Sequence, residues 1–115
     1  MDEDQNATYE EFARIDVRVG QVMQAEPLAG ARKPAYRLRI DFGPSIGIKQ
    51  SSAQVTELYN PADLIGRQVL AVVNFAPKRI AGFSSEVLVL GVPDEAGRVV
   101  LLQPQRAVPP GGRMY

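Results

Sequence analysis

Five short segments of the chain have the pattern of β-strands, and turn residues separate them. They are rich in β-branched and other apolar residues, and they span residues 17–25, 36–41, 46–51, 68–75 and 87–91. In residues 36–41 apolar and charged side chains alternate strictly, which predicts a strand with one buried and one solvent-exposed face. A chain of 115 residues with these segments is long enough to bury one core.

Short helical segments interrupt this β pattern. Thr8 and Glu11 form a capping-box pattern, which predicts a helical turn over residues 9–13 with Phe12 and Tyr9 packing inward. A second helical stretch is predicted over residues 53–59, stopped by Asn60-Pro61, and a third over residues 61–66. Gly20 is predicted to mark a bulge or tight bend in the first strand.

Five strands with a short helix between the third and the fourth describe a particular architecture. The prediction is an all-β, five-stranded OB-fold barrel with short helices and with N- and C-terminal extensions. A further apolar segment at 99–102 is additional to the five strands of the predicted barrel. It favours either a subunit contact or a cover over the barrel. The tail, residues 103–115, has three prolines and two glycines, so we expect it to be extended.

Charge is distributed unevenly along the chain. Formal net charge is zero, yet the first twelve residues hold five acidic and no basic side chains. The remaining 103 residues carry 13 basic and eight acidic side chains, a net charge of +5. We therefore expect an acidic arm at 1–11 and a mildly positive domain at 12–115. Such a domain suits salt-sensitive binding of a polyanion, although the same charge also serves solubility.

The residue types that the chain lacks narrow its chemistry. It contains neither histidine nor cysteine, which removes the commonest general base, the strongest neutral-pH nucleophile and zinc sites of the His/Cys type. No glycine-rich phosphate-binding motif occurs, and the serine pairs have no nucleophile motif around them. These absences predict a binding module without catalytic residues, metal or cofactor.

Three features of the sequence favour a cytoplasmic location. The longest apolar runs are only a few residues, far short of the ~20 that cross a membrane, and the acidic N-terminus is unlike a secretory signal. The absence of cysteine fits a reducing compartment. We expect a cytoplasmic protein that does not insert into membranes.

The insert between the fourth and fifth strands, residues 76–86, is the best candidate for a site. It concentrates polar and charged side chains at Lys78, Arg79, Ser84, Ser85 and Glu86. A cationic, hydroxyl-rich connection held by two strands suits the grip of a phosphate backbone. The alternative is an ordinary solvated hairpin loop.

Several segments resemble the tRNA-binding domain, a module appended to some methionyl- and phenylalanyl-tRNA synthetases. They are Asp16-Val-Arg-Val-Gly20, Asp41-Phe-Gly43, Pro61-Ala-Asp-Leu-Ile-Gly66 and the run at 73–82. Residues 46–54, 84–91 and 99–104 are most similar to the stand-alone, CsaA-like group of this family. The resemblance runs from about Phe12 to the C-terminus. Residues 49–53 and 85–88 depart from the wider module at segments that touch RNA, which leaves room for another ligand.

The resemblance implies a homodimeric OB-fold protein that binds tRNA by structure and tolerates sequence, with the C-terminal extension used for dimerisation. CsaA-like proteins are also described as export-related chaperones for unfolded or precursor polypeptides. The implied partners are therefore tRNA, such polypeptides and a second copy of the chain.

For RNA binding, the candidates divide by chemistry. Lys78 and Arg79 would contact phosphates, and Arg39 and Lys49 would extend the positive track along the barrel face. The neutral groups for phosphate, 2′-hydroxyl or base edges are Asn74, Ser84 and Ser85. Glu86 would orient Lys78 or Arg79, or accept from a base amino group. Asp16 and Arg18 have two possible roles, an internal salt bridge at the barrel mouth or a ligand contact.

Two other functions stay open. A peptide groove on the dimer would be lined by Tyr36, Phe75, Ile80 and Phe83, although such side chains are more often core. The protein would then be a polypeptide-binding chaperone without a physiological tRNA role. The third possibility is a dimeric adaptor for a synthetase or for the export machinery. RNA binding should weaken steeply with salt, whereas apolar peptide binding should survive it.

Overall fold

Strand β1, Val17–Pro27, organises the fold because it takes part in two ladders. In the computed structural model, which describes residues 5–115, its first half pairs with β4, Gln68–Val72, and its second half with β2, Tyr36–Asp41. A β-bulge between Val22 and Gln24 interrupts the β1–β2 ladder and bends the strand.

The prediction of a bulge or bend at Gly20 is wrong, because the bulge lies at Met23. A Cβ at Gly20 would lie 2.7 Å from Cε1 of Phe42. Gly20 therefore lets β1 approach the buried ring closely, which is a packing role rather than a turn role.

The main sheet has five antiparallel strands in the order β3-β2-β1-β4-β7. Strand β3 is Ile48–Ala53 and β7 is Leu88–Val89. No ladder joins these two edge strands among residues 5–115. The gap is bridged instead: Ser51 Oγ donates to Val87 O (3.0 Å), Glu86 N donates to Gln50 O (2.8 Å) and Ser52 N donates to Ser85 Oγ (3.1 Å). The predicted five-stranded OB-fold barrel is confirmed, in a nearly closed form.

Apolar and charged side chains alternate along β2, and the apolar ones enter the core as the sequence predicted. Leu38 and Ile40 are fully buried and Arg39 is exposed. Leu64 of helix α2, Pro61–Leu64, is also fully buried and packs with them in the same core cluster. Each such side chain contributes about 1.5–3 kcal/mol by leaving water.

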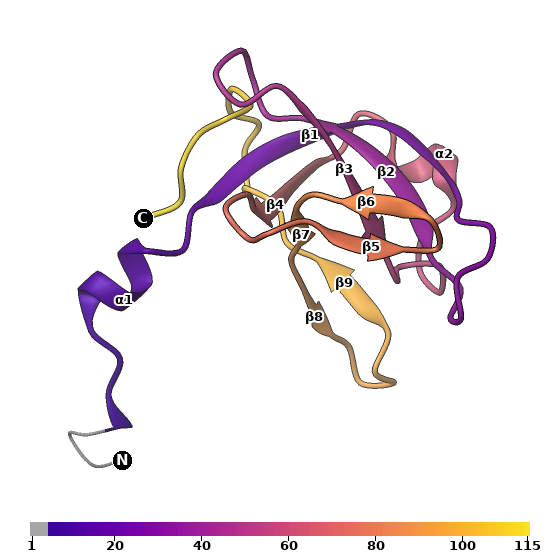
Figure 1. Ribbon diagram of the computed structural model, residues 1–115, viewed down its shortest axis with the longest axis horizontal. Coiled ribbons are helices and arrows are strands. Elements are labelled where there is room, and N and C mark those ends of the chain that lie inside the picture. The colour runs from indigo at the N-terminus through magenta and orange to yellow at the C-terminus, as the bar shows by residue number, and fades with distance from the viewer. Residues whose placement is uncertain (1–4) are drawn as a thin grey trace.

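The predicted N-terminal helix is present but does not pack inward. Helix α1, Tyr9–Ala13, has both capping-box bonds: Glu11 N donates to Thr8 Oγ1 and Thr8 N donates to Glu11 Oε1. Phe12 is 42% exposed and Tyr9 74% exposed. The helix projects from the barrel beyond the start of β1 (Figure 1), so no core lies beside it. The prediction of inward packing is wrong.

The predicted helix at 53–59 does not form either. Ala53 ends β3, and a hydrogen-bonded turn follows at residues 56–58. Tertiary bonds override the local preference, since Tyr59 O accepts from Tyr36 Oη (2.7 Å) and Tyr59 Oη accepts from Leu101 N (3.0 Å). Helix α2 is also shorter than the predicted 61–66.

Two hairpins lie outside the main sheet. Strands β5, Lys78–Ile80, and β6, Phe83–Ser85, form the first; β8, Gly91–Pro93, and β9, Val99–Leu101, form the second. The second projects from one end of the barrel (Figure 1). None of the described helices is both long and apolar enough to cross a bilayer.

Candidate nucleic-acid interface

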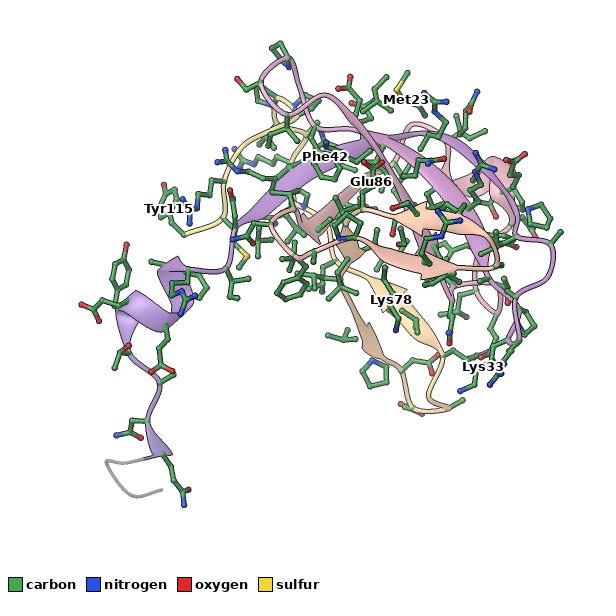
Figure 2. All side chains as sticks on the ribbon, viewed as in Figure 1. Met23, Lys33, Phe42, Lys78, Glu86 and Tyr115 are labelled. Atoms are coloured by element: carbon green, nitrogen blue, oxygen red, sulfur yellow. The ribbon has the colours of Figure 1, made fainter. Side chains whose placement is uncertain are left out.

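A cleft of about 620 Å³ lies between the loop at 28–35 and the β5–β6 hairpin. The loop contributes Arg32 and Lys33, and the hairpin contributes Lys78 and Arg79. We call this hollow, with these four side chains in its lining, the cationic cleft. In Figure 2 Lys33 lies on the side of the molecule away from Tyr115 and the N-terminal arm, and Lys78 lies nearer the middle of the barrel.

The two walls owe their shape to local turns. Leu28 N donates to Ala35 O (3.0 Å) and closes the loop. Ala81 and Gly82 connect β5 to β6 with φ of 49° and 85°, as in the type I′ turns that suit two-residue hairpins. A Cβ at Gly30 would lie 3.9 Å from the Cβ of Ala81. The tips of the loop and the hairpin are therefore near neighbours, with room for no more than a small side chain between Gly30 and Ala81.

The charge of the cleft is uncompensated. No acidic residue lines it, and in the described part of the chain none of its four cations forms a salt bridge. The neighbouring acids pair elsewhere: Glu26 lies 3.9 Å from Arg37, and Glu86 lies 4.0 Å from Lys49. Cations gathered in a hollow focus a positive potential that attracts anions.

Arg37 attaches the hairpin to the barrel. Its guanidinium lies over the ring of Phe83, 5.4 Å from the centroid, and its Nη2 donates to Gln50 Oε1 (2.9 Å). A cation–π contact of this kind contributes about 0.5–1 kcal/mol at an exposed site. The contact holds one wall of the cationic cleft against β2 and β3.

The predicted cations do not all share one surface. Lys78 and Arg79 line the cleft. In the β2–β3 ladder Arg39 pairs with Gln50 and Lys49 pairs with the buried Ile40. Because side chains alternate between the faces of a strand, Arg39 and Lys49 point to opposite faces of the sheet. The prediction that they extend one positive track is wrong.

The predicted polar groups are largely engaged inside the chain. Glu86 accepts from Gln50 N (3.0 Å) and pairs with Lys49, so it does not orient Lys78 or Arg79 as predicted. Ser85 is buried and accepts from Ser52 N, while Ser84, whose position alternates with it along β6, is half-buried.

Asn74 does not line the cationic cleft. It binds the backbone of residues 14–16, which connect α1 to β1. Its Oδ1 accepts from Asp16 N (2.9 Å) and its Nδ2 donates to Arg14 O (2.7 Å). Asp16 and Arg18 form the internal salt bridge that was one of their two predicted roles, at 2.7 Å. Arg18 Nη1 also donates to Gly111 O (3.0 Å), which ties the C-terminal tail to β1.

The predicted peptide-lining residues separate into two groups. Tyr36 is buried and its hydroxyl donates to Tyr59 O, so it is core and its assignment to a groove is wrong. Phe83 lies beneath Arg37. Phe75, 47% exposed, and Ile80 line a second hollow of about 220 Å³ with Val87 and Leu88.

Sequence reasoning missed Arg32, Lys33 and Arg37. The first two are adjacent basic residues in a loop flanked by Pro27 and containing Gly30 and Pro34. This signal went unused because the loop lies more than forty residues before Lys78. Only the barrel brings them together. Among residues 5–115 no acidic cluster suited to a metal ion occurs.

Three comparisons with known proteins agree with this geometry. The family model described as "Putative tRNA binding domain" matches residues 17–113. The chain is 36% identical over 105 residues to a methionine–tRNA ligase of Methanoculleus marisnigri and 38% identical over 103 residues to that of Methanothrix thermoacetophila. These matches cover 91% and 90% of the chain but only 15% of each ligase.

Solved structures match almost end to end. The chaperone CsaA of Bacillus anthracis is 58% identical, with a TM-score of 0.89 over 96% of this chain and 99% of that one. The CsaA chaperone protein of Picrophilus torridus is 47% identical, with a TM-score of 0.90 over 96% and 100%. A methionyl-tRNA-synthetase-related protein of Pyrococcus horikoshii is 27% identical, with a TM-score of 0.85 over 96% and 99%. The chain belongs to the tRNA-binding domain family, and it resembles the stand-alone CsaA proteins of that family.

Proposed function

We propose that this protein is a non-catalytic, cytoplasmic tRNA-binding protein and that the cationic cleft is its tRNA site. One observation carries the proposal: Arg32, Lys33, Lys78 and Arg79 converge on one hollow that has no acidic lining. Cations of this kind bind phosphate oxygens and position an RNA without reading its sequence. Affinity then comes from counterion release.

The family supports the same ligand. The sequence relatives are ligases that act on tRNA by name, and the cleft is formed by the loop between the first two barrel strands and an insert before the last one. OB-fold barrels commonly bind oligonucleotides through their loops and the face of strands 2 and 3.

The test is binding of bulk tRNA over a range of salt concentrations. Wild type is expected to lose affinity steeply as salt rises. Lys78→Ala/Arg79→Ala is expected to lose at least about 1 kcal/mol and to have a smaller salt slope. Arg98→Ala/Arg106→Ala, which removes the same two positive charges at exposed positions outside the cleft, is the matched control. Equal affinity of wild type and the double variant would contradict the assignment of the site.

A second candidate function is that of an export-related chaperone for unfolded or precursor polypeptides. Its motivation is a largely apolar seam between the unpaired edges of β3 and β7, which adjoins the cationic cleft at Lys78. The 220 Å³ hollow beside Phe75 and Ile80 shares Ser52 and Leu88 with a further hollow of about 350 Å³. Val55, Val89, Val99 and Leu101 line the latter. Apolar hollows beside strand edges suit an extended chain.

This function predicts salt-tolerant binding of a permanently unfolded polypeptide. Leu88→Ser should weaken it, while Ile65→Ser, an equally exposed apolar residue away from the seam, should not. Polypeptide binding that vanishes with salt would contradict the apolar seam. A protein partner in pull-down, with affinity for neither free ligand, would indicate the adaptor role for a synthetase or the export machinery.

We also propose that the protein is a homodimer. Helix α1 has five residues and none of them is buried, although so short a helix is unstable unless its apolar face packs. Val92 and Val100, a directly opposed pair on β8 and β9, are 47% and 36% exposed. A second copy that covers both features would account for them, and sedimentation equilibrium measures the assembly.

A further inference from the structure

We infer that the cationic cleft takes unpaired RNA nucleotides, with Ser52 and Gln54 on its floor contacting sugar and base, and that it does not bind the outside of a double helix. The inference rests on the proposed tRNA-binding function and specifies which form of RNA the site selects.

The floor of the cleft differs from its walls. Between the basic walls the lining is uncharged, and Ser52 and Gln54 are its two polar members. Ser52 pairs with Arg37 in the β2–β3 ladder, so its side chain shares the outer face of the sheet. Gln54 follows the end of β3 and is exposed.

These two floor side chains are free to bind a ligand. In the described part of the chain neither the hydroxyl of Ser52 nor the carboxamide of Gln54 forms a hydrogen bond. A hydroxyl and a carboxamide each donate and accept. They match a 2′-hydroxyl and the Watson–Crick edge of a base. A duplex also displays its 2′-hydroxyls, but the Watson–Crick edge becomes accessible only when the nucleotide is unpaired.

The size of the cleft suits a few unpaired nucleotides. Its volume of about 620 Å³ lies within the roughly 300–1,000 Å³ of hollows that enclose small ligands, which suits a short single-stranded segment. A double helix is far wider than this hollow, so only one of its backbones could enter, and its paired base edges would be turned away from Ser52 and Gln54.

The cleft also lacks a stacking platform. None of its lining residues is aromatic, and the nearby ring of Phe83 is covered by Arg37. Single-strand binders usually gain affinity from stacking on aromatic rings. Here affinity comes from the basic walls and the preference for unpaired RNA from the floor, so different residues control the two properties.

The experiment compares three probes by fluorescence anisotropy with the full-length protein. They are a short single-stranded RNA, the same RNA in a fully paired duplex, and a single-stranded DNA of the same sequence. We expect the RNA strand to bind at least ~tenfold more tightly than the duplex, and the DNA to bind more weakly than the RNA. Gln54→Ala and Ser52→Ala should reduce these preferences and leave the salt slope unchanged, whereas Lys78→Ala/Arg79→Ala should lower the slope for every probe.

The outcomes separate the two proposals. A duplex that binds as tightly as the single strand, with Lys78→Ala/Arg79→Ala still weakening both, would overturn the inference and leave the tRNA site standing. If the variant that combines Ser52→Ala and Gln54→Ala still prefers the single strand over the duplex and RNA over DNA, the role of the floor is overturned. A protein that binds neither tRNA nor any probe would overturn the proposed function itself. Thermal unfolding of each variant shows that it is folded.

Discussion

The two hairpins outside the barrel sheet have strands of the same length but opposite surfaces. Each pairs two strands of three residues. The β5–β6 hairpin carries Lys78 and Arg79 into a cleft without acidic lining, while the β8–β9 hairpin exposes the opposed valines Val92 and Val100. The barrel is therefore a scaffold common to both, and the side chains of each hairpin decide whether it suits an anion or an apolar partner.

The hairpins also differ in how their turns are stabilised. Ala81 adopts a left-handed φ of 49° in the first turn, which costs a non-glycine residue roughly 1–2 kcal/mol. The second turn places Gly97 at φ of 80°, and the Asp94 carboxylate accepts from Ala96 N (2.9 Å) and Arg98 N (2.8 Å). Strain is thus retained beside the cationic cleft, where the Cβ of Ala81 faces Gly30, and is absent from the apolar hairpin.

The largest expected effect is on assembly. Val92→Asp/Val100→Asp places two charges on the face proposed to contact a second copy, and burying unpaired charge is prohibitive. We expect the dimer to dissociate completely, as measured by sedimentation equilibrium, while each subunit keeps its fold. Glu95→Ala in the same hairpin is the control. A dimer that survives the double substitution would remove β8–β9 from the interface.

The next largest effect is on tRNA affinity, when a positive charge is reversed on one hairpin or the other. Lys78→Glu and Arg98→Glu make the same change of charge on the two hairpins. We expect the first to lower tRNA affinity at least ~tenfold and the second to change it little, because only Lys78 faces the cationic cleft. Binding is measured by anisotropy at fixed salt. Equal losses would mean that overall charge, and not the cleft, determines affinity.

Exchanging the turn residues gives a smaller, opposite pair of effects. Gly97→Ala should lower the free energy of unfolding by about 1 kcal/mol, because alanine is strained at this φ. Ala81→Gly should raise it by a few tenths of a kcal/mol to about 1 kcal/mol, since relief of strain is partly offset by the entropy of glycine in the unfolded chain. Urea unfolding measures both changes. A destabilised Ala81→Gly variant would show that the contact near Gly30 outweighs the strain.

The smallest effect is a pH dependence confined to one hairpin. Hydrogen bonding from Arg98 N, followed by that from Ala96 N and from the Arg98 guanidinium, holds the pKa of the Asp94 carboxyl below its ordinary value. A lowered pKa means that the contribution to stability is present above the unfolded value and is lost as pH falls through the folded one. As pH falls through the folded-state pKa of Asp94, the protection of the Ala96 and Arg98 amides against exchange, relative to their intrinsic rates, should therefore decrease, whereas protection in β5–β6 should not change. In the Asp94→Asn variant, the same two amides should show protection that does not change with pH in this range.

Much of the fold was predictable because its signals are local. Alternation in residues 36–41 predicted which side chains enter the core, and Thr8 with Glu11 predicted α1. The failed helix at 53–59 shows the limit, since the hydrogen bonds that hold Tyr59 come from Tyr36 and Leu101. Local preference is worth only tenths of a kcal/mol per residue and yields to such contacts.

The candidate site was predictable only in part. Lys78 and Arg79 were identified because they stand together between two apolar segments. Arg39 and Lys49 were grouped wrongly because the face of a strand residue depends on the register of β3 against β2. Glu86 was assigned to the wrong cation, since its partners Gln50 and Lys49 belong to a strand more than thirty residues earlier.

By itself the sequence determined the barrel architecture, the family and the segregation of charge, because periodicity, turn residues and motifs are local properties of the chain. Only the tertiary structure decided that Arg32 and Lys33 face Lys78 and Arg79 across a floor formed by Ser52 and Gln54. It also decided that Tyr36 is core and that Tyr9 and Phe12 are exposed. The physical reason is the same in each case: a cleft and a buried face are made by segments that are distant in sequence, and the closure of the barrel sets which of them meet.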